Sequence, residues 1–296
     1  MTGKNAVLVV GGDSLVGGGM VAALGRRGTT SYATTRRRDT VGAGRVYFDF
    51  ESFDSFQAPA DVGAACVIAA ATNYDRCETD PLAKVINVEL IPGAVAALLA
   101  QGLFVTFVST NSVFGGERPW PHEDDPHAPG IAYSRQKSDA EQIIREKAEQ
   151  IGATDRLNIV RLTKIMNAGV SPVPAWLESW KRNERVSPFE DLIFAPISVK
   201  FVGEALATIC EKRVSGNLHI SGAENVTYVE FANALAQRLG VDTSLIAATT
   251  ATAKGVNIAF KPRFSGLGMT RTAELTGVRP QPLGRLIDDI VDDLGH

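Results

Sequence analysis

Tyr133 and Lys137 lie four residues apart, and Thr110 precedes them directly after an apolar run, Phe104–Ser109. On a helix, residues four apart project from the same face. A lysine ammonium about 4 Å from a phenol favours the phenolate by roughly 4 kcal/mol, which lowers the tyrosine pKa by about three units. We therefore predict that Tyr133 is a general acid/base, that Lys137 lowers its pKa, and that Thr110 hydrogen-bonds the reacting oxygen.

A glycine turn follows the first apolar run, Ala6–Val10, and leads into a helical pattern, Val16–Arg27. Gly11 and Gly17 bracket Ser14; glycine allows a close backbone approach to a pyrophosphate, and a helix N-terminus offers free amides. A tight structural turn is the alternative, but the place between a strand and a helix favours a dinucleotide site. The predicted cofactor residues of this turn are Gly11, Asp13, Ser14, Leu15, Val16 and Gly17.

Arginines follow the second predicted strand, Thr30–Thr35. An acidic residue there would bind the adenosine ribose and repel a 2′-phosphate, whereas Arg36 and Arg37 offer planar, multidentate contacts to phosphate. A solvated charge run is the alternative. We predict that the two arginines hold the 2′-phosphate of NADP. Asp49 and Phe50, which close the next short β run, are included as cofactor residues, although Asp49 could equally be an ordinary turn or cap.

Strands and helices that alternate must position these residues. Crossover connections between such strands imply a parallel, doubly wound sheet, whose carboxyl edge binds ligands and includes Thr110. The predicted strands are Ala6–Val10, Thr30–Thr35, Ala64–Ala70, Phe104–Ser109 and Leu157–Leu162, and the predicted helices are Val16–Arg27, Pro81 to about Ala100, and Tyr133 to about Ile151.

The alternation breaks down after residue 166. Residues 167–195 contain prolines and tryptophans, residues 244–270 are rich in Thr, Ala and Gly, and helical patterns return at Val199–Lys212 and Tyr228–Leu239. We predict an α/β, Rossmann-type NADP-binding domain and a smaller, discontinuous C-terminal substrate lid. The domain comprises residues 1–166 with about 196–222, and the lid comprises about 167–195 and 223–296.

Composition excludes several classes of protein. The chain has 296 residues, 45% hydrophobic and 21% charged, with a formal net charge of −3, so neither nucleic acid nor a membrane surface is an expected partner. The run Ala6–Val10 is too short to cross a membrane, and we expect no other apolar stretch to be long enough. Three cysteines without a CxxC pair favour reduced thiols in a cytoplasmic protein. No metal is expected, the acidic loop His122–Asp125 is left without a role, and the oligomeric state stays open, a homodimer included.

Five segments carry a resemblance to a known family. Ser109–Gly116, Tyr133–Lys137, Ala69–Glu78, Val85–Val88 and Pro262-Arg263 are similar to segments of the extended short-chain dehydrogenase/reductases. Within them the chain most resembles the dTDP-4-dehydrorhamnose reductases, strongly over residues 5–165 and weakly afterwards.

The resemblance implies an NADPH-dependent reductase of a keto group on a nucleotide-linked sugar or another small carbonyl substrate. Its alternatives are an epimerase with a tightly held cofactor and a cofactor-binding regulatory subunit without turnover. The implied residues are Thr110, Tyr133 and Lys137 for catalysis, Ala69, Ala70, Ala71, Tyr133 and Lys137 for the cofactor, and Thr110, Asn111 and Arg263 for the substrate.

Three positions depart from the family pattern. Ser14 replaces the usual middle glycine, which is acceptable if its φ is negative. Asn111 replaces the aspartate that commonly follows the catalytic threonine. Thr163-Lys164-Ile165 lacks the tryptophan expected in a rhamnose-type sugar pocket. These departures do not affect the predicted fold or cofactor, but they leave the identity of the sugar undetermined.

Overall fold

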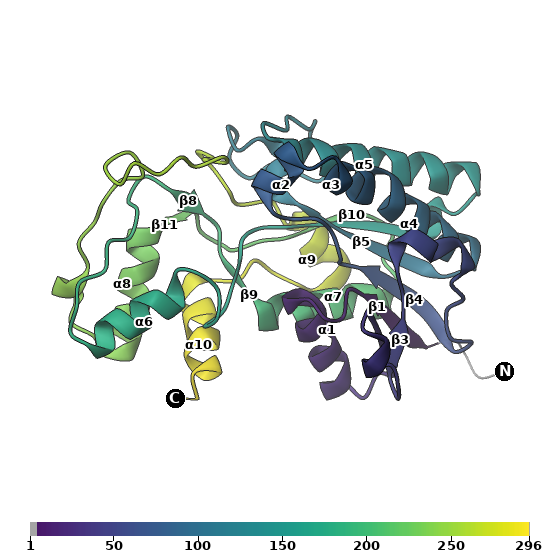
Figure 1. Ribbon diagram of the computed structural model, residues 1–296, viewed down its shortest axis with the longest axis horizontal. Helices are drawn as coiled ribbons and strands as arrows, with labels where there is room; N and C mark the ends of the chain where they lie inside the picture. Colours follow the sequence, from purple (N-terminus) through teal and green to yellow (C-terminus); the bar gives the residue numbers. More distant parts are fainter. Residues whose placement is uncertain (1–4, 296) are drawn as a thin grey trace.

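A seven-stranded sheet forms the centre of the structure, a computed structural model that describes residues 5–295 (Figure 1). All neighbouring strands are parallel, in the order β10-β6-β5-β4-β1-β2-β3. The direction of winding changes between β1 and β4, which confirms the predicted doubly wound, Rossmann-type fold. The strands are β1 (Ala6–Val10), β2 (Ser31–Thr35), β3 (Arg45–Tyr47), β4 (Val62–Val67), β5 (Phe104–Thr110), β6 (Leu157–Leu162) and β10 (Gly216–Ile220).

Helices cover both faces of this sheet because its strands are apolar on both sides. Leu8 and Val10 of β1 belong to the core beneath α4 and α5, while Val7 and Val9 belong to the core beneath α1 and α7. The covering helices are α1 (Leu15–Arg26), α4 (Ile91–Ala100), α5 (Ala132–Gln150) and α7 (Val199–Lys212).

One long helical segment contradicts the expectation that no further apolar stretch could cross a membrane. The segment Pro81–Ala100 has a mean hydropathy of 1.7 in its best window, which is sufficient by length and composition. It comprises α3 (Pro81–Lys84), the π-helical η3 (Val85–Leu90) and α4, and 44% of that window is buried inside the structure. Asp80 caps its first turn by accepting from Leu82 N at 3.0 Å. The segment packs on α5 as a layer of the fold.

A smaller part lies beyond the carboxyl ends of the strands, on the left in Figure 1. Its own core includes Trp176, Phe231 and Ile290, from three helices far apart in sequence. Its elements are α6 (Val173–Lys181), β8 (Ile193–Phe194), β11 (Val226–Thr227), α8 (Tyr228–Leu239), η6 (Thr243–Leu245) and α10 (Leu283–Asp293). The pair β7 (Ile165–Met166) and β9 (Ile197–Ser198) lies where the chain leaves and rejoins the sheet.

The chain crosses between the two parts several times. Within residues 223–296, α9 (Thr270–Thr276) packs against β10 and α7 rather than with the smaller part. Helix α9 thus lies with the sheet although the predicted lid includes it, and the domain boundaries stay a prediction. The remaining short elements are η1 (Arg38–Thr40), η2 (Phe50–Ser55), α2 (Tyr74–Thr79), η4 (Asn111–Phe114) and η5 (Thr154–Arg156).

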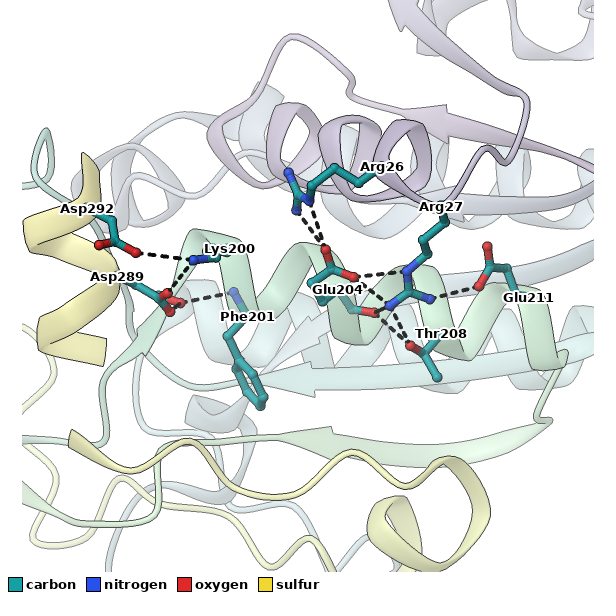
Figure 2. A network of polar contacts seen from close by, with 10 residues as sticks. Arg26, Arg27, Lys200, Phe201, Glu204, Thr208, Glu211, Asp289 and Asp292 are labelled. Atoms are coloured by element: carbon teal, nitrogen blue, oxygen red, sulfur yellow. Dashed lines mark hydrogen bonds and ion pairs between the residues drawn. The ribbon is translucent and has the colours of Figure 1, made fainter. Parts of the chain in front are cut away.

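Ion pairs bind three surface helices together along one side of the molecule (Figure 2). Arg26 of α1 and Arg27, which caps that helix, contact Glu204 of α7 at 2.7 and 2.6 Å, and near the start of α7 Lys200 contacts Asp289 of α10 at 3.1 Å. Helix α7 thereby joins the sheet to the last helix of the smaller part. Because most of these side chains are partly exposed, each pair contributes little alone.

Two predicted strands end differently in the structure. The strand expected at Ala64–Ala70 is Val62–Val67, so Ala69–Ala71 form a loop at the carboxyl edge. The short β run expected to close at Asp49 and Phe50 ends at Tyr47, because Asp49 caps η2 by accepting from Glu51 N at 3.2 Å. The cap interpretation of Asp49 is thus the one that its geometry supports.

Candidate active site

Thr110, Tyr133 and Lys137 come together at the carboxyl edge of the sheet. Thr110 is the last residue of β5, and its hydroxyl accepts from Ser112 N at 3.2 Å, which starts η4. Tyr133 lies in the first turn of α5, and Lys137 follows one turn later on the same face. The Thr110 hydroxyl is close enough to the Tyr133 phenol to favour its ionised form.

The Tyr133 phenol is held in its neutral form. Surrounding protein removes water from it, and Tyr74 and Cys77 lie nearby, so the Tyr133 pKa is raised well above its usual value. The Tyr74 ring packs beside it, with ring centroids 5.3 Å apart. No cation is among the causes of this shift in the protein alone, so the expectation that Lys137 lowers the Tyr133 pKa stays a prediction.

The Lys137 ammonium lies against strand β5. Its ammonium donates to Val108 O at 2.8 Å and lies 4.0 Å from the centroid of the Phe107 ring. The side chain is 2% exposed, and burial lowers the Lys137 pKa to about 7, although Glu141 one turn along α5 acts in the opposite direction. At neutral pH the group is therefore close to its midpoint of protonation and can gain or lose a proton readily.

The glycine turn has the geometry that a pyrophosphate site needs. Gly11 has φ +96°, and a Cβ at Gly17 would lie 2.1 Å from Gly11 O, so no other residue fits there. Ser14 has φ −80°, which removes the objection to its replacing a glycine, and it caps α1 by accepting from Gly17 N at 3.0 Å. The exposed turn and the N-terminus of α1 thus fit a dinucleotide phosphate. Leu15 and Val16 begin that helix.

A cluster of arginines surrounds Asp13 beside this turn. Arg37 Nη2 donates to Asp13 Oδ1 at 3.1 Å, and Arg45 Nη2 donates to the same oxygen at a shorter distance. Arg36 is exposed next to them. The sequence analysis missed Arg45, which comes from β3; the pairing of β3 with β2 brings it to Arg37. The sequence did contain a signal for this residue, since Arg45 is a basic residue at the start of the next short β run.

The loop Ala69–Ala71 is fixed by two side chains that the sequence analysis did not assign. Asn87 accepts from Ala71 N at 3.0 Å and donates to Ala71 O at 2.9 Å. It also donates to Gln136 Oε1 of α5 at 2.9 Å. The signal was present, since Asn87 is a polar residue within an apolar helical run. Asn87 and Gln136 hold the loop in place beside Gly11, so close that a Cβ added at Gly11 would lie 2.8 Å from Ala69 Cβ.

Asn111 holds a loop of the C-terminal half in place. Its amide donates to Ser265 O at 2.8 Å and to Ser265 Oγ at 3.0 Å. From the smaller part, Asn225 Oδ1 accepts from Ser265 N at 2.7 Å and from Gly266 N at 2.8 Å. The segment carrying Arg263 is therefore fastened to the end of the catalytic strand. In this geometry Asn111 positions that segment, and its role in binding substrate stays a prediction.

Arg263, next to Phe264, is exposed and forms no ion pair among the described residues. Its guanidinium carbon lies 5.5 Å from the centroid of the Phe264 ring. Lys261, by contrast, pairs with Asp191 at 2.6 Å.

The acidic loop His122–Asp125 forms a turn, in which Asp125 Oδ2 accepts from His122 N at 3.0 Å and Asp124 pairs with Arg271. Within residues 5–295, no group of three or more His, Cys, Asp or Glu could hold a metal ion.

A parallel sheet with a glycine turn after β1 and with Thr110, Tyr133 and Lys137 at its carboxyl edge defines the class of extended short-chain dehydrogenase/reductases. The chain belongs to the family described as RmlD substrate binding domain, whose model matches residues 5–295. This confirms the family that the sequence motifs indicated.

Three known proteins illustrate the likeness. Spore coat polysaccharide biosynthesis protein SpsK of Bacillus subtilis is 27% identical over 279 residues, 93% of each chain. Methionine adenosyltransferase 2 subunit beta of Pongo abelii is 26% identical over 185 residues, 60% of this chain and 54% of that protein. The crystal structure of dTDP-4-dehydrorhamnose reductase from Bacillus anthracis in complex with NADP has a TM-score of 0.80 and 19% identity, covering 98% and 99% of the two chains.

Proposed function

We propose that the protein is an NADPH-dependent reductase of a keto group on a nucleotide-linked sugar. The observation that carries the proposal is the meeting of Thr110, a neutral Tyr133 and a buried Lys137 at the carboxyl edge of a dinucleotide-binding sheet. Membership of the RmlD substrate binding domain family supports it, as does the likeness to a reductase solved with NADP.

The protonation state of Tyr133 favours the reductive direction. A carbonyl that accepts a hydride needs a proton on its oxygen, and a phenol with a raised pKa carries that proton at neutral pH. Thr110 and Tyr133 donate hydrogen bonds to the carbonyl oxygen, and Tyr133 then transfers its proton to it. Lys137, with a pKa of about 7, supplies positive charge near the phenolate that remains. A bound nicotinamide cofactor supplies the hydride.

The cofactor is held by groups described above. The turn Gly11–Gly17 and the start of α1 receive the pyrophosphate, and the loop Ala69–Ala71 lines the ribose and diphosphate side. Arg36 and Arg37 receive the 2′-phosphate, since guanidinium groups bind phosphate through several hydrogen bonds. Tyr133 and Lys137 complete the site at the nicotinamide end.

Measuring cofactor consumption tests this function. The protein is mixed with NADPH and a panel of 4-keto nucleotide sugars, and loss of NADPH absorbance is followed together with the sugar product. We expect NADPH to be consumed in a 1:1 ratio with the reduced sugar. An epimerised sugar without net consumption would assign the protein to the epimerases instead. Binding of NADPH without any turnover would assign it to the regulatory subunits, a role suggested by the relative named as a subunit of an adenosyltransferase.

Arg263 provides a prediction about the substrate. Its exposed guanidinium suits the diphosphate of a nucleotide sugar, and a lost charge-assisted hydrogen bond costs about 1.5 kcal/mol or more. Arg263→Ala is therefore expected to raise KM for a nucleotide sugar about tenfold, with NADPH affinity unchanged. Lys254→Ala, which removes another cation of the 244–270 stretch, is the matched control and should leave KM as it is. Equal turnover of a sugar without its nucleotide would point to a smaller carbonyl substrate.

A further inference from the structure

The arginine cluster beside the glycine turn has one carboxylate at its centre. Asp13 accepts from Thr35 Oγ1 at 2.7 Å through one oxygen and from both Arg37 and Arg45 through the other. The Thr35 hydroxyl, with Arg45 and Arg37, lowers the Asp13 pKa to about 2. Asp13 is thus ionised throughout the range in which the protein works, and a negative charge stands where two guanidinium groups converge.

The backbones of the two arginines are held in this place without Asp13. The backbone N of Arg37 donates to Thr35 Oγ1 at 3.0 Å. Arg45 exchanges backbone hydrogen bonds with Gly42, at 2.9 and 3.1 Å, and belongs to the strand that pairs with β2. Both backbones are therefore anchored by contacts that the carboxylate does not make.

A 2′-phosphate bound at this cluster meets an anion already in contact with its arginines. Each guanidinium has several donors, so it can contact both anions, but the two negative charges repel each other over a few ångströms. Arg37 has a side chain 64% exposed, so water and salt weaken the effect without removing it. On electrostatic grounds, the carboxylate lowers the affinity for the phosphate more than it helps by ordering the side chains of two arginines whose backbones are anchored without it.

We propose that Asp13 is an internal counter-ion that competes with the cofactor's 2′-phosphate for Arg37 and Arg45, and thereby limits the preference for NADPH over NADH. The proposal rests on the assignment of this turn to a dinucleotide under the proposed function. It makes Asp13 and Arg45 residues that set cofactor specificity, in addition to the arginines that directly follow β2.

Asp13→Asn tests the proposal, since the amide oxygen can still accept from Thr35 while the charge is lost. Calorimetric titration of the full chain with adenosine 2′,5′-bisphosphate and with AMP isolates the contribution of the 2′-phosphate, without any turnover. We expect Asp13→Asn to bind the bisphosphate about three- to tenfold more tightly, with AMP affinity unchanged and a gain that shrinks as salt is added. Arg45→Ala is expected to weaken the bisphosphate alone.

Asp39→Asn is the matched control, because Asp39 is an exposed acid next to Arg38 that forms no ion pair within residues 5–295. It should not change the affinity for the bisphosphate, and melting curves should show that all variants are folded. Unchanged or weaker binding of the bisphosphate by Asp13→Asn, with AMP still bound, would overturn the competition while leaving the proposed function intact. Failure of the wild type to bind either nucleotide would overturn both.

Discussion

Tyr133→Phe is expected to lower kcat by roughly 10³-fold while the affinity for NADPH stays within about twofold of the wild type. The substitution keeps the ring against Tyr74 and removes the hydroxyl that carries the transferred proton. General acid catalysis of this kind contributes about 10²–10⁴-fold to a rate. Steady-state turnover of a nucleotide sugar that the panel shows to be reduced, together with NADPH fluorescence titration, measures the two quantities separately.

Tyr32→Phe is the control for this experiment. It removes a phenol hydroxyl on β2 that contacts Asp61 at 3.2 Å, away from Thr110 and Lys137, and should leave kcat unchanged. Turnover close to normal in Tyr133→Phe would remove the tyrosine from the mechanism and require another proton donor at the carboxyl edge.

Lys137→Met is expected to lower turnover by about 10²-fold or more and to change the pH dependence of stability. The Lys137 pKa is lowered from 10.5 to about 7, so the folded state disfavours the charged form. Below pH 7 the wild type bears the full destabilisation of that buried charge. As the pH rises above 7, the folded lysine loses its proton, the unfolded lysine keeps its own, and the wild type gains stability.

Methionine carries no charge, so the variant lacks this gain. We expect the free energy of unfolding of Lys137→Met, relative to the wild type, to fall by roughly 3 kcal/mol between pH 6 and pH 9. Urea unfolding at the two pH values measures it, and Lys84→Met, on an exposed lysine of α3, is the control that should show no such difference. The same difference at both pH values would mean that Lys137 is charged throughout.

Elements that depend on local sequence were predicted closely. The strand Ala6–Val10 and the helix Val199–Lys212 have the predicted bounds. Continuous apolar runs make buried strands recognisable, and in the helix Ser198 accepts from Phe201 N at 3.0 Å and marks the first turn. The segment Pro81–Ala100 was likewise recognisable from Asp80-Pro81.

Contacts between distant residues were beyond the reach of sequence patterns. Asn111 and its partner Ser265 are 154 positions apart, so no spacing rule connects them. The neutral state of Tyr133 depends on how much water its neighbours exclude, which is a property of the folded chain. The two-residue strands β8 and β11 are too short for a period-two pattern to be seen. The raised pKa of Tyr133 and the partners of Asn111 are therefore properties of the folded chain that the sequence did not reveal.

The chain crosses repeatedly between the sheet and the smaller part, and this limits which segments can be exchanged with a relative to make a hybrid protein. Helices α6, α8 and α10 share one core, yet α7 and β10 separate the first two in sequence, and α9 separates the last two (Figure 1). A hybrid with one crossover point between α6 and α10 would take part of the core of the smaller part from each parent protein. New substrate preferences in this architecture should therefore arise by point changes and loop insertions, and a working chimera needs matched exchanges at all three helices.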